Sequence, residues 1–560
     1  MRLEKNISAV YPRPPRPTKH LNSRSTRILL AACLWLCLVP AFGAETGPVA
    51  TQVVITGVQV TGSTLLSSVE IAGVLANIRG SRTLAELQGA AAAVQDLYRA
   101  AGYGGVVAFL PEQALSSGTL VINVLEGRVA QVVISGNRKF SAANVRRGLP
   151  VVQEGLTPKV RAYDTAVQLA NENPAKQLAV TLEEGQKRGD IDVRISVIEG
   201  AVQRFTLLAD NTGNAQTGRT RLTAGYQNAA LSDRDDQVSA QVQISPEKLD
   251  AVRVFSLGYR LPLYDLGMML QAYTSYSNVI SATAATAAGD LNFSGQGRVL
   301  GLELTRFIER AGEFEQRVSV ALDKRDYLNN CAIQGLPDGA CGSAGASVSV
   351  HPLTLNYQNL RKGGRPAGIS LALSSNLALG GSNSSEADFD AVRPGASRNF
   401  QMLRASAFLS LPVGDNWQLN FRAIGQATSS KLVPGEQFGL TSVGVVRGYE
   451  EREVTGDSGL AGSFEVLMPT LLPAPPGQLA IGFHDLRLFG FVDAGVTSNR
   501  DGLTCDGLKT SCQLSSIGLG TRFSFGQSLW RIDLARANDN ARLTASGDLR
   551  IHFSARYAFP

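Results

Sequence analysis

Hydrophobic and polar residues alternate with a period of two through the C-terminal part of the chain, residues 200–560. The alternation is clearest in residues 237–245, 402–411 and 550–559, although Phe408 interrupts the polar positions of the second stretch. Successive side chains of a strand point to opposite faces, so this pattern predicts strands with one apolar and one polar face. We mark roughly sixteen such segments, each long enough for the about 9–11 residues with which a tilted strand crosses a membrane.

Two kinds of β protein show this alternation, a soluble β-sandwich and a transmembrane barrel. The outward positions of a soluble sandwich are strongly charged. Here many outer positions are Leu, Val, Tyr or Phe, and only 18% of the chain is charged. A strand with one face against lipid and the other against a wet lumen accounts for both observations. We therefore predict an all-β transmembrane barrel of about sixteen antiparallel strands.

The residues before this region follow a different pattern, in which short strands and helices succeed one another twice. A helix over residues 84–101 is indicated because apolar residues recur at helical spacing from Leu84 to Tyr98. The order of strand, two helices and two strands then repeats, which predicts two copies of one small α+β domain, at residues 52–127 and 128–199. Each copy leaves a sheet edge that can pair with an extended peptide. The expected strands are 53–60, 106–110, 120–125, 129–135, 178–182 and 191–198, and the other expected helices are 67–77, 142–147 and 163–171.

An apolar stretch, residues 28–42, lies between a basic leader and the small residues Gly43 and Ala44. This order is typical of a secretory signal peptide, which we predict over residues 1–44 in an extended form. A signal anchor that stays attached is the alternative, but the stretch is short for a membrane-spanning helix.

The predicted signal also carries the net charge of the chain. Residues 1–44 hold seven of the 53 basic and one of the 47 acidic side chains, so the remaining 46 of each sign balance. The formal net charge of +6 therefore leaves with the signal. Binding to nucleic acid depends on an excess of Lys and Arg, so we expect no nucleic-acid partner.

Four cysteines remain after the signal, as two local pairs in stretches rich in Gly, Asn and Asp. The pairs are Cys331 with Cys341 and Cys505 with Cys512. In an exported protein this spacing predicts two possible loop disulfides. A zinc site is the alternative, but there is no C-x-x-C motif and no nearby His, so we predict no metal site.

Several short motifs occur in a fixed order along the chain. Their order and spacing resemble the outer-membrane transporters of two-partner secretion, the TpsB type that exports haemolysins and haemagglutinins. This family belongs to the superfamily that also contains the barrel-assembly protein, and the resemblance covers nearly everything after the signal. The motifs are Leu110–Gln113 with Val124–Gly127, Asn173-Pro174, Asp210–Gly213, Pro434–Phe438 leading into Val446–Tyr449, and Phe491–Gly495.

The resemblance implies a function. The two α+β units would be POTRA domains in the periplasm, and the barrel would be a pore in the bacterial outer membrane. Such a protein captures an unfolded exoprotein of the adhesin or haemolysin type through its POTRA domains and translocates it to the cell surface. It is not an enzyme and needs no cofactor. Its other expected partners are outer-membrane lipid and, during biogenesis, the barrel-assembly machinery.

The resemblance also implies that a long loop, residues 429–460, folds into the barrel. The site residues would then be Val446, Arg447, Gly448 and Tyr449 on the loop, and Phe491, Asp493 and Gly495 on a strand.

The chemistry of these residues favours a pair between Arg447 and Asp493. Asp493 shares one strand face with Phe491 and Gly495, and a carboxylate facing lipid is costly, so this face should line the lumen. An Arg is always charged and clamps a carboxylate with two parallel bonds. Gly448 lets the loop backbone turn tightly. The alternative is an exposed turn Arg and an unrelated lumen-lining Asp.

Two features depart from the family's pattern. Phe559 is the aromatic residue nearest the end of the last strand, but Pro560 follows it. Only residues 45–51 stand between the predicted signal and the first strand, too few for a helix that plugs the pore. We expect either no plug or another element in the lumen.

Three other functions remain open at this point. An outer-membrane insertase would share the loop and strand motifs, but more than two POTRA domains would favour it. A barrel hydrolase would need a catalytic constellation, and His484-Asp485 is the only pair of that appearance, with no G-x-S-x-G motif near a His. A passive porin has no place for the two periplasmic domains.

Overall fold

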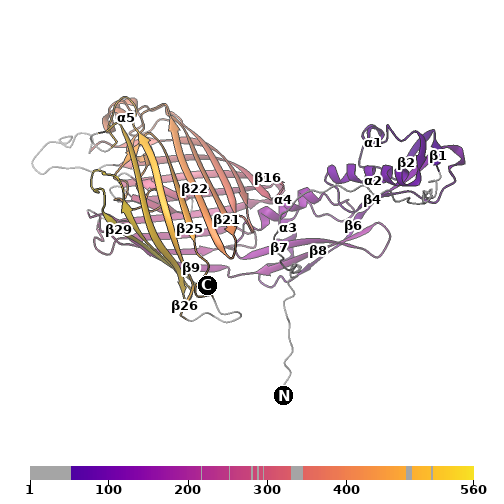
Figure 1. Cartoon of the computed structure of the whole chain (residues 1–560), viewed down its shortest axis with the longest axis horizontal. Coiled ribbons are helices and arrows are strands. Elements are labelled where there is room, and N and C mark those ends of the chain that lie inside the picture. The colour runs from indigo at the N-terminus through magenta and orange to yellow at the C-terminus, as the bar shows by residue number, and fades with distance from the viewer. Residues whose placement is uncertain are drawn as a thin grey trace, which may run out of the picture. The chain divides into compact units, whose positions relative to one another are not determined.

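The computed structural model describes residues 52–560 in two small α/β modules and one closed barrel (Figure 1). The predicted signal, residues 1–44, lies outside the described residues. Among the residues that are described, no helix is long and apolar enough to cross a membrane. Also outside the description are residues 45–51, 216, 251, 279–281, 287–288, 294–295, 329–344, 474–481, 506–508 and 560.

The first module is a three-stranded sheet whose central strand, β5, runs parallel to β2 and antiparallel to β4. Helix α2 packs on this sheet and buries Leu87, Val94 and Tyr98, which recur at helical spacing. A capping box of Thr83 and Glu86 starts the helix. The elements are β1 Gln52–Ile55, β2 Gly57–Thr61, α1 Ser68–Val74, β3 Gly80–Thr83, α2 Leu84–Ala100, β4 Val106–Phe109, η1 Leu115–Ser117 and β5 Thr119–Glu126.

The strand predicted over residues 53–60 is two strands, β1 and β2. The chain breaks at Thr56, whose amide and hydroxyl both donate to the carbonyl oxygen of Gly118, at 2.8 and 3.2 Å. Strand β1 then pairs with β3, which the sequence pattern did not predict. Its four residues, Gly-Ser-Arg-Thr, include no apolar side chain, so only tertiary pairing reveals it.

The second module repeats the same sheet topology. Strand β8 is central, parallel to β6 and antiparallel to β7. Its core holds Val145 and Leu149 near α3, Leu169 from α4, and Val193 and Ile195 from the central strand. The elements are β6 Arg128–Ser135, α3 Ala142–Gly148, α4 Val160–Ala170, β7 Lys176–Glu184 and β8 Asp190–Glu199.

Each of the two modules contains a turn that is built in the same way. A Cβ at Gly62 would collide with the carbonyl oxygen of Val124, and a Cβ at Gly136 would collide with that of Val197. Both glycines have a positive φ, 80° and 87°. Two residues beyond each valine, Glu126 and Glu199 accept hydrogen bonds from the backbone amides that follow the turn. The predicted internal repeat therefore extends to individual turn residues.

Sixteen antiparallel strands of the described chain close into the barrel, if β18 and β19 are taken as one strand interrupted at His351. Helix α5 Glu386–Val392 lies at one end (Figure 1), and a separate hairpin is formed by β14 Ala282–Thr286 and β15 Gly289–Phe293. The barrel strands are β9 Gln203–Asp210, β10 Arg221–Asn228, β11 Gln237–Ile244, β12 Arg253–Leu263, β13 Met268–Ser277, β16 Gln296–Ala311, β17 Phe314–Leu328, β18 Val348–Val350, β19 Pro352–Arg361, β20 Ala367–Asn376, β21 Gln401–Val413, β22 Trp417–Thr428, β25 Ser458–Leu467, β26 Phe483–Ser498, β27 Ser511–Phe525, β28 Ser528–Ala537 and β29 Leu549–Phe559.

The predicted alternation is present along these strands. On β27, Ile517 and Leu519 are 51% and 70% exposed on the outer face, whereas Ser516 is fully buried on the inner face. The barrel closes where β29 pairs with β9 from Ser554 to Phe559. Asn211 extends this pairing by one step, because its side-chain amide bonds the carbonyl of Ile551 and the amide of Phe553 at 2.7 and 2.9 Å.

A buried polar cluster joins the second module to the β10–β11 turn of the barrel. Lys176 donates to Asp235 at 2.6 Å and to Asn144 at 2.5 Å, and its side chain is fully buried. Asp235 also accepts from Asn173 at 2.9 Å and from the hydroxyl of Tyr264, in the η2 turn Tyr264–Leu266, at 2.6 Å. This cluster shows which end of the barrel lies next to the modules.

Candidate functional site

The connection between β22 and β25 supplies one half of the site. It contains the short helix η4 Pro434–Glu436. After this helix, β23 Phe438–Gly439 and β24 Thr455–Gly456, of two residues each, pair as a short hairpin. Beyond this hairpin the loop lies inside the barrel. Its apolar residues pack with inward-facing Ala461 and Leu514 in one buried cluster. The loop ends at Asp457, earlier than the predicted residue 460, because the next residues already pair with β22 and β26.

Arg447 lies at the tip of this loop and is fully buried. Its Nε donates to Oδ2 of Asp493 at 2.6 Å, and its Nη2 donates to Oδ1 at 2.7 Å. The backbone amide of Arg447 adds a bond of 3.2 Å to the same carboxylate. Asp493 lies on β26 and is also fully buried. This is the two-bond clamp that suits a guanidinium and a carboxylate.

The wall around Arg447 contains the predicted Phe491 and three residues that sequence patterns did not single out, Ser463, Glu465 and Asp533. The guanidinium lies 3.4 Å from the ring centre of Phe491, a cation–π contact. Its Nη1 donates to Glu465 at 2.9 Å and to Asp533 at 3.4 Å, and its Nη2 to Ser463 at 3.1 Å.

Two further arginines balance this acidic wall. Arg522 and Arg531 donate to Glu465 at 2.6 and 2.8 Å, and Arg531 also binds Asp533. Three carboxylates thus meet three guanidinium groups, which is how charges are accommodated in a buried site. Alternation marks Glu465 and Asp533 as inward-facing, but it does not show which residues of separate strands meet.

Gly448 brings the loop close to the last two strands. It has φ +94°, and an added Cβ would lie 3.3 Å from the Cβ of Ala535 on β28. Its amide donates to Nε2 of His552 on β29 at 3.0 Å. A glycine is therefore required here both for the backbone conformation and for the close approach.

The remaining predicted residues lie in the same region. Val446 is fully buried in the apolar cluster of the loop. The hydroxyl of Tyr449 donates to the carbonyl oxygen of Ser515 at 2.7 Å, so its ring packs against the inner wall. Gly495 leaves room for the loop residue Leu440, whose side chain would meet a Cβ at 2.6 Å. All seven residues predicted from the loop and strand motifs are thus brought together.

A second ionic contact holds the first part of the loop, between β22 and β23. Glu436 is fully buried, and its carboxylate accepts from Arg325 at 2.9 Å, from Arg404 at 3.1 Å and from the hydroxyl of Tyr327 at 2.8 Å. These partners come from β17 and β21, whereas Arg447 meets β25, β26 and β28. The loop is therefore attached to two separate parts of the barrel wall.

Comparison with known proteins decides the family. The sequence profile of the haemolysin secretion/activation proteins ShlB/FhaC/HecB matches residues 189–523, more than half of the chain. The chain belongs to this family. A profile of the ShlB-type POTRA domain matches residues 53–127 of the first module. This ShlB/FhaC/HecB family member is accordingly a two-partner secretion transporter of the outer membrane, with POTRA structure in the periplasm.

Individual relatives agree with this assignment. The outer membrane transporter CdiB of Escherichia coli is 24% identical over 436 residues, which cover 76% of this chain and 70% of that protein. The heme/hemopexin transporter protein HuxB of Haemophilus influenzae is 22% identical over 482 residues, which cover 84% and 81%. The solved structure of E. coli CdiB superposes with a TM-score of 0.76 at 20% identity and covers 93% of each chain. That structure supports the fold of the family member described here.

The cysteines of this family member lie outside the ionic site. Cys505 in the β26–β27 connection and Cys512 on β27 form a disulfide, with their Cα atoms 6.1 Å apart. Both side chains join the buried cluster that also contains Val446 and Tyr449. The other predicted pair, Cys331 and Cys341, lies outside the described residues. The pair His484-Asp485 is separated by 3.8 Å, and Asp485 is half exposed on a bulge of β26.

Proposed function

We propose that the periplasmic modules are two POTRA domains, residues 52–127 and 128–199, and that the second captures an extended segment of an unfolded exoprotein. The exoprotein is of the adhesin or haemolysin type. The captured chain passes through the barrel, residues 200–560, without a chemical step and without a cofactor. The barrel-assembly machinery inserts the transporter into outer-membrane lipid before export begins.

The free edge of β7 carries this proposal. The side-chain amide of Asn171 bonds both the amide and the carbonyl of Leu178, at 2.6 and 3.1 Å, so these groups point away from β8. By the two-residue period of a strand, the backbone groups of Val180, Leu182 and Glu184 point the same way. Within the described residues no hydrogen bond to these outward groups is present. An extended peptide can satisfy them by adding a strand.

The first module offers less free edge. The side chain of Gln95 accepts from the amide of Ala108 on β4 at 3.2 Å. Gln113 bonds both the amide and the carbonyl of Val121 on β5, at 2.7 and 2.8 Å, where β4 has already ended. These glutamines occupy the positions that an added strand would use, which favours the second module as the capture site.

The loop residues Val446–Tyr449 and the strand residues Phe491, Asp493 and Gly495 are proposed to hold the lumen closed between export events. The loop tip fills the inside of the barrel wall at β25–β29, so a passing chain must displace it. The Arg447–Asp493 clamp opposes this displacement, and its opening is the step that exposes the path. This supports a gating role for the clamp rather than a role in barrel folding.

Secretion measured in a host that carries this gene and a neighbouring large exoprotein gene tests the proposal. Val180→Pro removes one outward amide of β7, which an edge strand tolerates, and Val180→Thr keeps that amide. We expect exoprotein in the medium with the wild type and Val180→Thr, and a strong loss with Val180→Pro and with deletion of residues 52–199. Equal secretion by Val180→Pro would exclude β7 as the capture edge. Failure of other barrels to assemble on depletion, without any export, would instead indicate an insertase.

A further inference from the structure

We propose that Arg393 and Asp457 form a latch at the extracellular mouth of the barrel, which ties the segment around α5, residues 377–400, to loop 429–457. The latch closes the mouth at rest and opens when an exported chain leaves. The proposal rests on export through this barrel, but it does not depend on which periplasmic edge captures the exoprotein.

The position of the latch follows from the strand order. The turns at one end of the barrel include the β10–β11 turn, which the second module contacts through Asp235. In an antiparallel barrel the connections alternate between the two ends, so β20–β21, β22–β25 and β26–β27 lie together at the opposite end. Because the modules are periplasmic, that end faces outside the cell. In the part of the chain that the structure describes, residues 377–400, 429–457, and 499–505 with 509–510 form these three connections.

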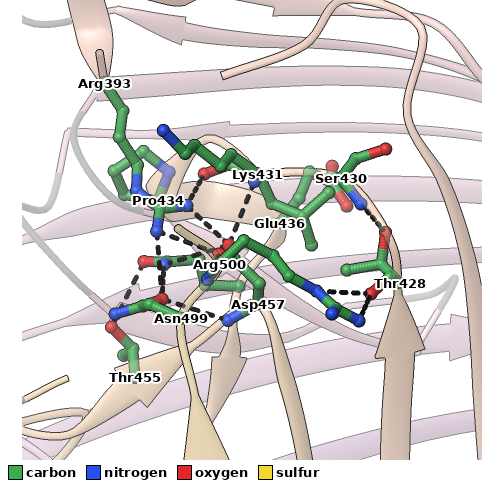
Figure 2. A network of polar contacts seen from close by, with 12 residues as sticks. Arg393, Thr428, Ser430, Lys431, Pro434, Glu436, Thr455, Asp457, Asn499 and Arg500 are labelled. Carbon is green, nitrogen blue, oxygen red and sulfur yellow. Dashed lines mark hydrogen bonds and ion pairs between the residues drawn. The ribbon is translucent and has the colours of Figure 1, made fainter. Parts of the chain in front are cut away.

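Asp457 connects all three. Its carboxylate is fully buried and accepts from both terminal nitrogens of Arg393, at 2.5 and 3.0 Å (Figure 2). It also accepts from the amide of Leu432 at 3.0 Å and from the amide of Arg500 at 2.9 Å. Although burial alone would raise the pKa of Asp457, these bonds hold it below its ordinary value, so the carboxylate stays charged.

Neighbouring side chains extend the same network. Asn499 accepts from Arg393 at 3.0 Å and from the amide of Asp457 at 3.2 Å, and Arg500 reaches the carbonyl oxygen of Thr428 at the end of β22 (Figure 2). Arg393 also donates to the carbonyl oxygen of Leu432 at 2.5 Å. One arginine therefore holds a backbone group and the carboxylate of the loop at the same time.

The segment around α5 is folded rather than a loose surface loop. Phe389 on α5 and Phe400 just before β21 are both fully buried. They share one apolar cluster with Leu432 and Val433, which lie in the first part of the loop, shortly after β22. The backbone amide of Ser397 donates to the carbonyl oxygen of Lys431 at 3.2 Å. The same cluster includes Tyr327 of β17 and Val350 of β18, so the two rings pack against both the loop and the barrel wall. The segment and the loop must separate or move together for the mouth to open.

The latch differs from the clamp at Arg447 in what it joins. The clamp attaches the loop tip to the fixed strands of the wall. The latch attaches the loop base to two other extracellular connections, through Arg393 and through Asn499 and Arg500. We therefore expect latch variants to change how long the pore stays open while the barrel itself remains assembled.

The first test is the conductance of the purified full-length protein in planar lipid bilayers. Asp457→Asn keeps the shape of the side chain and removes its charge, and Arg393→Ala removes the other partner. We expect each to lengthen the time spent open by about tenfold, which corresponds to about 1.4 kcal/mol. The matched control is Glu386→Gln, which alters an exposed carboxylate on α5 itself. Unchanged conductance in both latch variants, with heat-resistant barrels, would overturn the proposal.

The second test leaves the latch residues in place. Ser397→Cys and Lys431→Cys together place two thiols at a backbone hydrogen bond between the two segments, and oxidation joins them. We expect oxidation to stop exoprotein secretion and a reductant to restore it, with the single-cysteine variants and the wild type as controls for the Cys505–Cys512 disulfide. Undiminished secretion with the crosslink formed would show that the mouth need not open here. If the wild type exports nothing but the latch variants still change the conductance, the proposed export function fails and the latch does not.

Discussion

The backbone amide of Gly448 donates to Nε2 of His552 at 3.0 Å, which places the tip of the long loop on the last strand of the barrel. The same loop meets β26 through Arg447, one residue earlier. Strand β29, on which His552 lies, is the strand that pairs with β9 to close the barrel. The loop tip therefore contacts both the wall that carries Asp493 and the strand at the point of closure.

Arg447→Lys is expected to weaken the closed state, so that the pore spends more time open, while the barrel remains assembled. A lysine retains the charge but cannot form the two parallel bonds to Asp493, so about 1.5–3 kcal/mol of charged hydrogen bonding is lost from the closed loop. Secretion assays and bilayer conductance measure the effect, and heat-modifiable mobility in gels measures barrel assembly. Arg253→Lys, in an exposed pair with Asp250, serves as the control. Normal export and conductance by Arg447→Lys would mean that two-bond geometry is unimportant.

Gly448→Ala is expected to act through the backbone. The left-handed region costs a residue with a side chain roughly 1–2 kcal/mol, and the new Cβ would press on Ala535. We expect the loop tip to bind the wall less tightly, so that proteolysis from the outside cuts it sooner in the variant. Gly364→Ala, at an open turn with nothing within 4 Å of the added Cβ, should leave the pattern unchanged.

The first module should lose stability at acid pH through Glu126. Burial would raise the pKa of this carboxyl, but hydrogen bonds from the side chain and backbone of Thr64, the amide of Leu65 and the hydroxyl of Tyr98 outweigh it and lower the pKa. Burial raises the pKa of Tyr98 to about 12, which keeps its hydroxyl a donor. A lowered carboxyl pKa stabilises the fold at pH values above the unfolded pKa of about 4.3, and the contribution is lost as pH falls through the folded value.

Calorimetry of the full-length protein checks this, because the periplasmic modules should melt at a lower temperature than the barrel. The difference in melting temperature between the wild type and Glu126→Gln is expected to be largest above pH 5 and to shrink below about pH 4.3. A difference that is the same at pH 7 and pH 3 would contradict the role of the charge. Glu112→Gln, on the same module, is the control.

Much of the fold could be predicted because it follows from one periodicity. Residues such as Ile517 and Leu519 alternate with Ser516 along the strand, so the two faces of the barrel are visible in the sequence. The clamp was predictable for a different reason, since Arg447 and Asp493 lie in two recognisable motifs. Asp533 and His552 lie in no motif, and a period of two does not say which strands face the same loop. Their part in the site depends on how the long loop folds against the wall, where β28 and β29 follow β26 and β27 by antiparallel pairing.

The junction between the second module and the barrel was also beyond sequence analysis. Lys176 and Asp235 are 59 residues apart, one at the start of β7 and the other in the β10–β11 turn of the barrel. Asp235 also has φ +64°. An Asp can adopt this conformation, but its presence in a sequence does not predict it. Only the Asn173-Pro174 motif drew attention to this region, and Asn173 indeed bonds Asp235. Long-range polar pairs of this kind leave no local pattern.

Lys176→Met is expected to loosen this junction, because it leaves the Asp235 carboxylate buried without its cation. Removing one partner of a buried ion pair typically costs about 3–5 kcal/mol. Replacing both partners, as Lys176→Met with Asp235→Asn, removes the unpaired charge and should recover much of that loss, since Asn173 and Tyr264 remain as hydrogen-bond partners. Hydrogen exchange at α3 and the β10–β11 turn measures the effect in the intact protein. If the double variant exchanges as fast as Lys176→Met, the charge of Asp235 does not hold the junction. If neither variant differs from the wild type, the module is held to the barrel by apolar packing around Tyr264 and Phe307 instead.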